Sequence, residues 1–264
     1  MIKTSVLSLT TVGIATARIT SNPRFLARSR ATNSCFKAIE DIDAQESELS
    51  GTYGSLTSQW YDDRFVVSDE SSAIVWDDDS NNELQSYRGT MAPLTILKDS
   101  ELKSSVESGD YYKWGDSYET ISVWGETRSF EDIKQGGIGN CYFMAGLAIA
   151  AHMGQSNVDG DDKKLIVKKV MPLDDLSSNG IYPVTYFIGG MPRRIFLDNN
   201  LVQGYVNDDS SRQVTNEYAY VGSDGSIWTQ LFEKAWAKNN GNYNHIVGGD
   251  VGEAIYAMTG APFY

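Results

Sequence analysis

The sequence predicts an α+β fold with a buried helix, further helices and a small antiparallel sheet. A glycine-rich loop at 135–140 leads into residues 141–153, which are almost all apolar or small. Such a segment predicts a helix that is apolar on every face and therefore buried. Three strand-like runs at 164–170, 181–188 and 193–197, separated by turn signals, indicate an antiparallel sheet with one wet face.

Two more helices are expected towards the C-terminus. Apolar side chains recur at four-residue intervals over residues 227–238, which predicts a helix with a broad apolar stripe. Three charged side chains lie outside this stripe and are expected to face solvent: Glu233, Lys234 and Lys238. A second helix over 251–258 should end at Gly260, because helices commonly end at a glycine.

The glycine-rich loop carries the candidate site. The run Gln-Gly-Gly-Ile-Gly-Asn-Cys places Cys141 at the first turn of the predicted helix. The free amide groups of a helix N-terminus favour negative charge, so a thiolate nucleophile is stabilised there. The side-chain amide of Gln135 can donate a hydrogen bond to an oxygen that becomes negative when the thiolate attacks a carbonyl. The alternative is that Cys141 is a small buried apolar residue and Gln135 an ordinary loop residue.

Composition limits the classes of protein that fit. At 264 residues and 41% hydrophobic content, the chain can bury a full core in one or two domains. Its two cysteines, Cys35 and Cys141, show no metal-site spacing and no disulfide framework. A bridge between them would consume the candidate nucleophile. The net charge of −13 argues against nucleic acid as a partner.

The N-terminal region differs from the rest in charge. Residues 1–39 contain six basic and no acidic side chains. Lys3, an apolar run at 6–15 and an Ala-Thr-Ala triplet have the three parts of a secretory signal peptide, which we predict over residues 1–17. A mitochondrial transit segment is the alternative. The apolar run is too short for a transmembrane segment.

Residues 18–92 are basic and then acidic, and we expect this region to be largely irregular. The acidic runs at 40–43 and 77–83 are typical of solvated faces or tethers. A pro-segment or regulatory arm that lies in the cleft is the alternative interpretation.

Two blocks of the sequence resemble the calpain-type cysteine proteases. Gln-Gly-x-x-Gly-Asn-Cys-Tyr at 135–142 is similar to the family's Gln-Gly-x-x-Gly-Asp-Cys-Trp. Residues 228–238 are similar to its Trp-x-x-Leu-x-Glu-Lys-Ala-Tyr-Ala-Lys helix. Three shorter matches follow in the family's order: Gly241-Asn242-Tyr243, Gly248-Gly249 and Thr259-Gly260.

The resemblance covers roughly residues 114–264 and implies a papain-like core of two lobes. The first lobe supplies the nucleophile and the oxyanion donor, matched by Cys141 and Gln135, and we assign it to residues 93–264. The second lobe supplies the imidazole base and its orienting Asn, in His-Ala and Asn-Pro-Trp motifs that follow the matched region in the family. The implied function is a calcium-dependent cysteine-type endopeptidase that cleaves protein or peptide substrates by thiolate attack, with the His/Asn lobe missing from this chain.

Neither histidine of the chain suits the role of the base. His152 lies eleven residues after Cys141 on the same predicted helix, about 16 Å along its axis. His245 lacks a flanking motif of the right kind and is expected to be a surface loop residue. We therefore expect negligible peptidase activity from these 264 residues alone. The alternative function is a catalytically incomplete module that binds peptide or calcium, and a third interpretation has an inert cysteine.

The resemblance also implies calcium as a cofactor, with Asp132 as a ligand and the backbone carbonyls of Val123 and Gly125 nearby. Ser226 replaces the family's second carboxylate, and Asp224 is the candidate substitute. Hard cations need several oxygen ligands and some negative charge. The alternative is that Asp132 caps or solvates a loop.

Two positions of the signature depart from the family pattern, with Asn140 in place of Asp and Tyr142 in place of Trp. We expect Tyr142 to keep an aromatic wall beside the nucleophile. The family is mainly cytosolic, which conflicts with a signal peptide, so the localisation stays open. The sequence does not define an oligomeric state.

Overall fold

The computed structural model describes the following residues: 37–65, 95–98, 121–125, 129–155, 166–203, 205–207, 214–216, 218–222 and 224–263. The predicted signal peptide and the acidic run at 77–83 lie outside the described residues. Within the described ranges, no helix has the length and apolar composition needed to cross a membrane.

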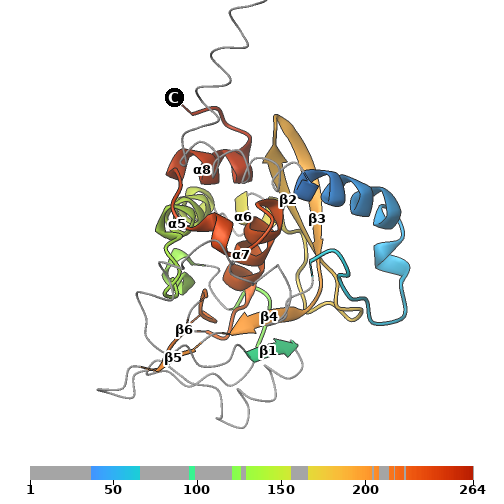
Figure 1. Cartoon of the computed structure of the whole chain (residues 1–264), viewed down its shortest axis with the longest axis horizontal. Coiled ribbons are helices and arrows are strands. Elements are labelled where there is room, and N and C mark those ends of the chain that lie inside the picture. Colours follow the sequence, from blue (N-terminus) through green and yellow to red (C-terminus); the bar gives the residue numbers. More distant parts are fainter. Residues whose placement is uncertain are drawn as a thin grey trace, which may run out of the picture.

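The fold is α+β, as predicted (Figure 1). Its helices are the following: a helix over residues 37–49, α5 (Cys141–Gln155), α6 (Ile166–Val170), α7 (Trp228–Asn239) and α8 (Val251–Thr259). Its strands are the following: β1 (Thr95–Lys98), β2 (Tyr182–Ile188), β3 (Met191–Leu197), β4 (Asn200–Gln203), β5 (Tyr205–Asn207) and β6 (Val214–Asn216). Three 3-10 turns complete the described part: η1 (Tyr53–Ser55), η2 (Phe130–Asp132) and η4 (Asn244–Ile246).

The described strands pair two by two, and every pair is antiparallel: β1 with β4, β2 with β3, and β5 with β6. The longest pair, β2–β3, is closed by Gly189 and Gly190, which both have a positive φ. A two-residue hairpin turn of this kind suits glycine, because both central positions require a left-handed backbone. The antiparallel pairing predicted for 181–188 and 193–197 is therefore confirmed.

The strand predicted at 164–170 was wrong, because its described part, residues 166–170, is helix α6. Val167 and Val170 are its buried residues, and α6 packs against α5 and β2. Apolar residues three apart share one face of a helix, whereas a strand would place them on opposite faces. The apolar positions 166, 167 and 170 thus follow a helical period that the short run obscured.

Helix α5 is buried on most of its surface but not on all of it. It packs against α8, and at the closest point a Cβ added to Gly146 would lie 2.6 Å from the Cβ of Ala254. The expectation of burial on every face was wrong for one stripe. Four exposed side chains follow it at four-residue intervals: Cys141, Ala145, Ile149 and Met153.

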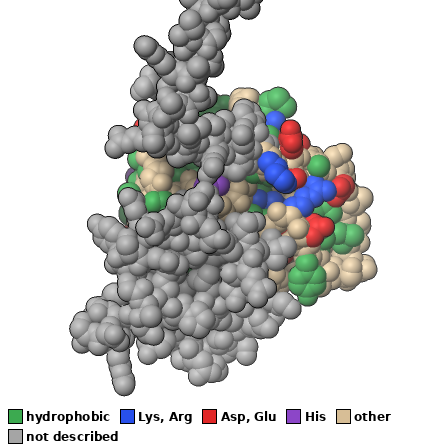
Figure 2. Space-filling model, in the orientation of Figure 1, with side chains coloured by type: hydrophobic (Ala, Val, Ile, Leu, Met, Phe, Trp, Pro, Cys, Tyr) green, Lys and Arg blue, Asp and Glu red, His purple; other side chains and the backbone are tan. Residues whose placement is uncertain are grey.

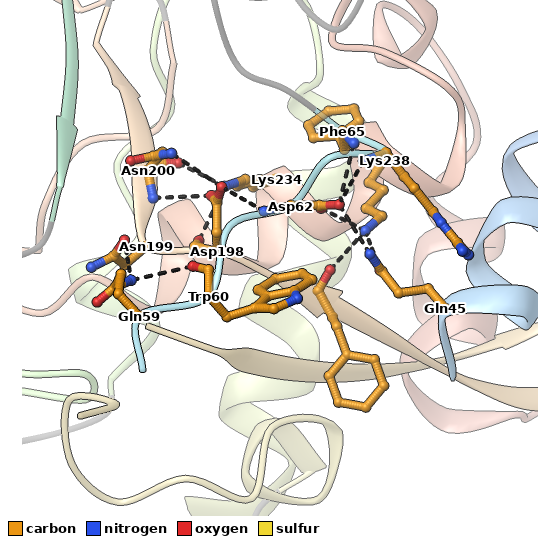
Figure 3. Close-up of polar contacts among 12 residues, drawn as sticks. Gln45, Gln59, Trp60, Asp62, Phe65, Asp198, Asn199, Asn200, Lys234 and Lys238 are labelled. Atoms are coloured by element: carbon orange, nitrogen blue, oxygen red, sulfur yellow. Dashed lines mark hydrogen bonds and ion pairs between the residues drawn. The ribbon is translucent and has the colours of Figure 1, made fainter. Parts of the chain in front are cut away.

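Helix α7 is buried at all twelve of its positions. The expectation that Glu233, Lys234 and Lys238 face solvent was therefore wrong. Lys238 donates hydrogen bonds to the side chains of Gln45 and Asp62, each at 2.6 Å, and to a strand carbonyl (Figure 3). Lys234 forms an ion pair with Asp198, and the lysine side chain is 0% exposed. Paired and hydrogen-bonded in this way, both ammonium groups are tolerated in the interior.

The helix over residues 37–49 lies in the region that was expected to be largely irregular. This helix and the segment that follows it to residue 65, which we call the N-terminal segment, lie beside β3 and α7. Figure 2 shows Lys and Arg side chains beside Asp and Glu side chains on this part of the surface. Its acidic residues are thus partly engaged in ion pairs rather than forming a free tether, as Arg193–Asp43 and Lys238–Asp62 show.

Candidate active site

Cys141 is the first residue of α5, as predicted, and its side chain is exposed. The two residues on either side of it point the other way, because Asn140 is 0% exposed and Tyr142 is 8% exposed. The chain therefore presents the thiol outward at the start of the helix while anchoring both neighbours in the core. Tyr142 packs inward, and the aromatic wall beside the nucleophile that the sequence suggested remains a prediction.

Gln135 is exposed at the start of the loop that leads to Cys141. Its side-chain Nε2 donates a hydrogen bond of 2.8 Å to the carbonyl oxygen of Ile138. A glutamine amide has two N–H groups. The Ile138 bond uses one of them and holds the side chain over its own loop.

The Gly248-Gly249 turn closes over this loop. The backbone N–H of Gly248 donates a 2.8 Å hydrogen bond to the carbonyl of Gly139, and Gly248 has a φ of 72°, which suits glycine. A Cβ at Gly249 would lie 2.5 Å from the ring of Tyr142. The two glycines singled out in the sequence thus allow a backbone turn to lie directly against the residues around Cys141.

Glu233 of α7 binds the residue that precedes Cys141. One of its carboxylate oxygens accepts a 2.7 Å hydrogen bond from the side-chain amide of Asn140, and the other accepts a 2.9 Å bond from the backbone N–H of Ala219. Burial raises the pKa of Glu233 to about 7, while these two hydrogen bonds act in the opposite direction. Sequence reasoning missed this contact because it placed Glu233 on a solvent face.

Trp236, one turn further along α7, binds the residue that follows Cys141. Its indole N–H donates a 2.8 Å hydrogen bond to the hydroxyl oxygen of Tyr142, and its ring stacks on Phe143 with centroids 5.3 Å apart. Burial raises the pKa of the Tyr142 phenol, so the hydroxyl is neutral at physiological pH. The periodicity placed Trp236 near the core, but it could not show the partner of the indole N–H.

The structure tests only one of the two histidines as a base for Cys141. His152 is near the other end of the same continuous helix, about 16 Å along the axis from Cys141, where it packs edge-on against Phe130. It therefore cannot reach the thiol. His245 lines a cavity of about 230 Å³ between the N-terminal segment and the end of α7, and its Nδ1 lies 2.8 Å from the carbonyl oxygen of Asn240.

The candidate calcium ligands gather beside η2. A Cβ added to Gly222 would lie 3.1 Å from both the Cβ of Asp132 and a carboxylate oxygen of Asp224. The hydroxyl of Ser226 is buried and has no hydrogen-bond partner among the described residues. One carboxylate oxygen of Asp132 also accepts a 3.0 Å bond from the N–H of Ser129 and so caps η2. Among the described residues, no group of three His, Cys, Asp or Glu side chains is placed to hold a metal ion.

An exposed thiol at the start of a largely buried helix, within an α+β core with antiparallel strands, is the architecture of the cysteine proteases with a papain-like fold. More narrowly, the chain belongs to the calpain family, because residues 97–264 match the family described as calpain family cysteine protease.

Individual relatives agree with this membership. Calpain-B of Drosophila melanogaster is 27% identical over 196 residues, which cover 69% of this chain and 19% of that protein. Calpain clp-4 of Caenorhabditis elegans is 32% identical over 140 residues, which cover 52% of this chain and 17% of that protein. Calpain-8 of Rattus norvegicus is 29% identical over 141 residues, with 52% and 17% covered. The chain thus matches about a fifth or less of the length of these relatives.

Proposed function

We propose that this chain carries the nucleophile-bearing lobe of a cysteine-type endopeptidase that acts on protein substrates. The observation that carries the proposal is the exposed thiol of Cys141 at the first residue of α5, between two buried neighbours. The dipole and free N–H groups of the helix terminus favour the thiolate there. Membership of the calpain family supports the reaction class.

In the proposed reaction, the Cys141 sulfur forms a bond to the carbonyl carbon of the scissile peptide, and the carbonyl electrons move onto its oxygen. An N–H of Gln135 donates to that oxygen. The C–N bond then breaks, the leaving amine takes up a proton, and water hydrolyses the resulting thioester. The proton must come from a general acid, which we assign to an imidazole of a second lobe, because His152 lies too far along α5 and His245 lacks a matching motif.

The reactivity of the thiol tests the proposal. We expect Cys141 in the folded chain to react with iodoacetamide at pH 6 about two- to fivefold faster than Cys141 in the urea-unfolded chain, since an unactivated thiol reacts slowly at that pH. Mass spectrometry of the Cys141 peptide separates it from Cys35. An equal or slower rate in the folded chain would refute an activated nucleophile and leave an inert cysteine.

Peptidase activity gives a second test. The 264 residues alone should show negligible turnover of a peptide substrate, because no imidazole is in place to protonate the leaving amine. Turnover that disappears in Cys141→Ser would contradict this expectation. If the thiol is activated but no turnover occurs, the alternative of a catalytically incomplete module that binds peptide or calcium remains, and adding the His/Asn lobe of a relative would distinguish the two.

We also propose that calcium binds beside η2, with oxygens from Asp132, Asp224 and Ser226 as ligands. The cation would supply positive charge that holds the η2 turn, which precedes the Cys141 loop, against the segment that contains Asp224 and Ser226. The buried Ser226 hydroxyl and the nearby carboxylate of Asp224 support this site. Calorimetric titration should show calcium binding that is weakened in Asp224→Asn. No heat of binding in the unaltered chain would rule the site out.

A further inference from the structure

We propose that helix α7 positions the nucleophile by holding the residues on both sides of it, Asn140 through Glu233 and Tyr142 through Trp236. This inference depends on the proposed role of Cys141. Glu233 and Trp236 are three positions apart on the helix and therefore project from the same side. Their bonds to the two neighbours measure 2.7 Å and 2.8 Å.

The side chains around Cys141 alternate in direction, and this allows α7 to fix the direction of the thiol. With Asn140 and Tyr142 both drawn inward, the residue between them projects outward. Asn140 also begins α5, because its carbonyl accepts hydrogen bonds from the N–H groups of Phe143 and Met144. Fixing Asn140 therefore fixes both the direction of the thiol and the start of the helix whose N–H groups stabilise the thiolate.

The two anchoring residues are themselves held firmly. The second carboxylate oxygen of Glu233 accepts from the N–H of Ala219, and the carbonyl of Ala219 accepts from the side chain of Gln230, also on α7. The ring of Trp236 stacks on Phe143 and meets the ring of Tyr186 edge-on. Because α7 is buried along its whole length, it provides a rigid reference for the loop.

The hydrogen bond between Trp236 and Tyr142 joins an aromatic side chain of α7 to the residue that follows the cysteine. An indole N–H can donate to a phenol oxygen whichever of the two positions carries each residue. Exchanging the two residues should therefore keep a donor and an acceptor together.

Variants that remove one partner of either hydrogen bond test whether α7 positions Cys141. Tyr142→Phe removes the acceptor of Trp236, and Glu233→Gln places an amide N–H against a donor so that one of its two bonds is lost. In folded protein at pH 8, where Glu233 is ionised, each should slow the alkylation of Cys141 by about two- to fivefold, the range that a helix terminus contributes. The curve of alkylation rate against pH, measured from pH 5 to 8, should also differ from that of the wild type. The exchange variant Tyr142→Trp/Trp236→Tyr should recover the rate that the single change loses.

Tyr186→Phe is the matched control. Phenylalanine keeps the ring that meets Trp236 edge-on and removes only the buried hydroxyl, which donates a 2.9 Å hydrogen bond to the carbonyl of Phe232 on α7. This variant should lower the stability without changing the alkylation of Cys141. All rates are measured where near-ultraviolet circular dichroism shows native protein, so unfolding does not contribute.

The inference is wrong if Tyr142→Phe and Glu233→Gln alkylate at the wild-type rate, or if Tyr186→Phe slows the reaction equally. The single variants decide the question if the exchange variant does not fold. Each variant is compared with the folded wild type. The result therefore does not depend on whether Cys141 reacts faster in the folded wild type than in the unfolded chain. Failure of the positioning role and failure of the proposed function are therefore seen in different comparisons.

Discussion

Glu233 combines complete burial with hydrogen bonds that favour its charged form. Desolvation is the larger effect and raises its pKa to about 7, against the ordinary 4.5. Between these two values the folded protein retains a proton that the unfolded chain has already lost. The contribution of Glu233 to stability is therefore fully present below pH 4.5 and is lost as the pH rises through about 7.

Glu233→Gln should remove this part of the pH dependence. At about 1.4 kcal/mol per pH unit, the window between the two pKa values corresponds to about 3 kcal/mol. Urea denaturation of both proteins at pH 5, 6, 7 and 8 measures the difference. We expect the wild-type free energy of unfolding to fall more steeply from pH 5 to 7 than that of the variant. Parallel curves would mean that Glu233 titrates normally.

Asp62 keeps Lys238 charged inside the protein. Burial lowers the pKa of Lys238, and the Asp62 carboxylate opposes that shift. Asp62→Asn should therefore lower the free energy of unfolding by about 3 kcal/mol or more, because breaking a buried ion pair leaves an uncompensated charge. Asp41→Asn is the control, since Asp41 pairs with the exposed Lys37 at 2.6 Å and should change stability by less than about 1 kcal/mol. Equal effects in chemical denaturation would show that burial does not set the strength of these pairs.

At the level of whole elements, strong local signals gave correct predictions. The hairpin β2–β3 follows from two runs of strand-forming residues around Gly189-Gly190, and α8 ends at Gly260, which has a φ of 69°. Helix α7 begins and ends within one residue of its predicted bounds. In each case the deciding residues are neighbours in the sequence, so the pattern alone contains the information.

The wrong predictions about charged side chains of α7 share a different cause. Lys238 and its partners Gln45 and Asp62 are 193 and 176 residues apart in the chain, so periodicity treated the lysine as a surface residue. Glu233 reaches Asn140 across 93 residues. Buried polar pairs of this kind depend on the tertiary fold, and a sequence pattern contains no sign of the partner. The roles of Cys141 and Gln135 likewise remain predictions, although the position of Cys141 at the start of α5 is confirmed.

The contact between α5 and α8 depends on Gly146. Alanine at this position would gain about 1 kcal/mol in helix propensity, but its Cβ would lie 2.6 Å from the Cβ of Ala254. Relieving such overpacking costs about 1–3 kcal/mol, so Gly146→Ala should be destabilising despite the better helix former. Gly54→Ala is the control, because nothing lies within 4 Å of its added Cβ. A thermal melt of Gly146→Ala at or above the wild-type midpoint would contradict close helix packing.

For the molecule as a whole, the N-terminal segment is part of the same packed body as the helices that follow the Cys141 loop. The Asn179 side chain donates to the carbonyl of Tyr53, and the N–H of Asp62 donates to Asp198. These bonds connect the segment to residues more than a hundred positions away. The boundary at residue 93 between the N-terminal region and the first lobe therefore remains a prediction.

This arrangement determines where the chain can be cut for expression. The family match begins at residue 97, but a protein started there would lose Gln45 and Asp62 and leave the ammonium group of Lys238 with only the Phe196 carbonyl of its three partners. We expect such a truncation to aggregate or to melt well below the chain that starts before residue 37, and light scattering with calorimetry would compare the two. We therefore expect the smallest autonomous folding unit to be longer than the region that homology outlines, and expression trials should begin upstream of it.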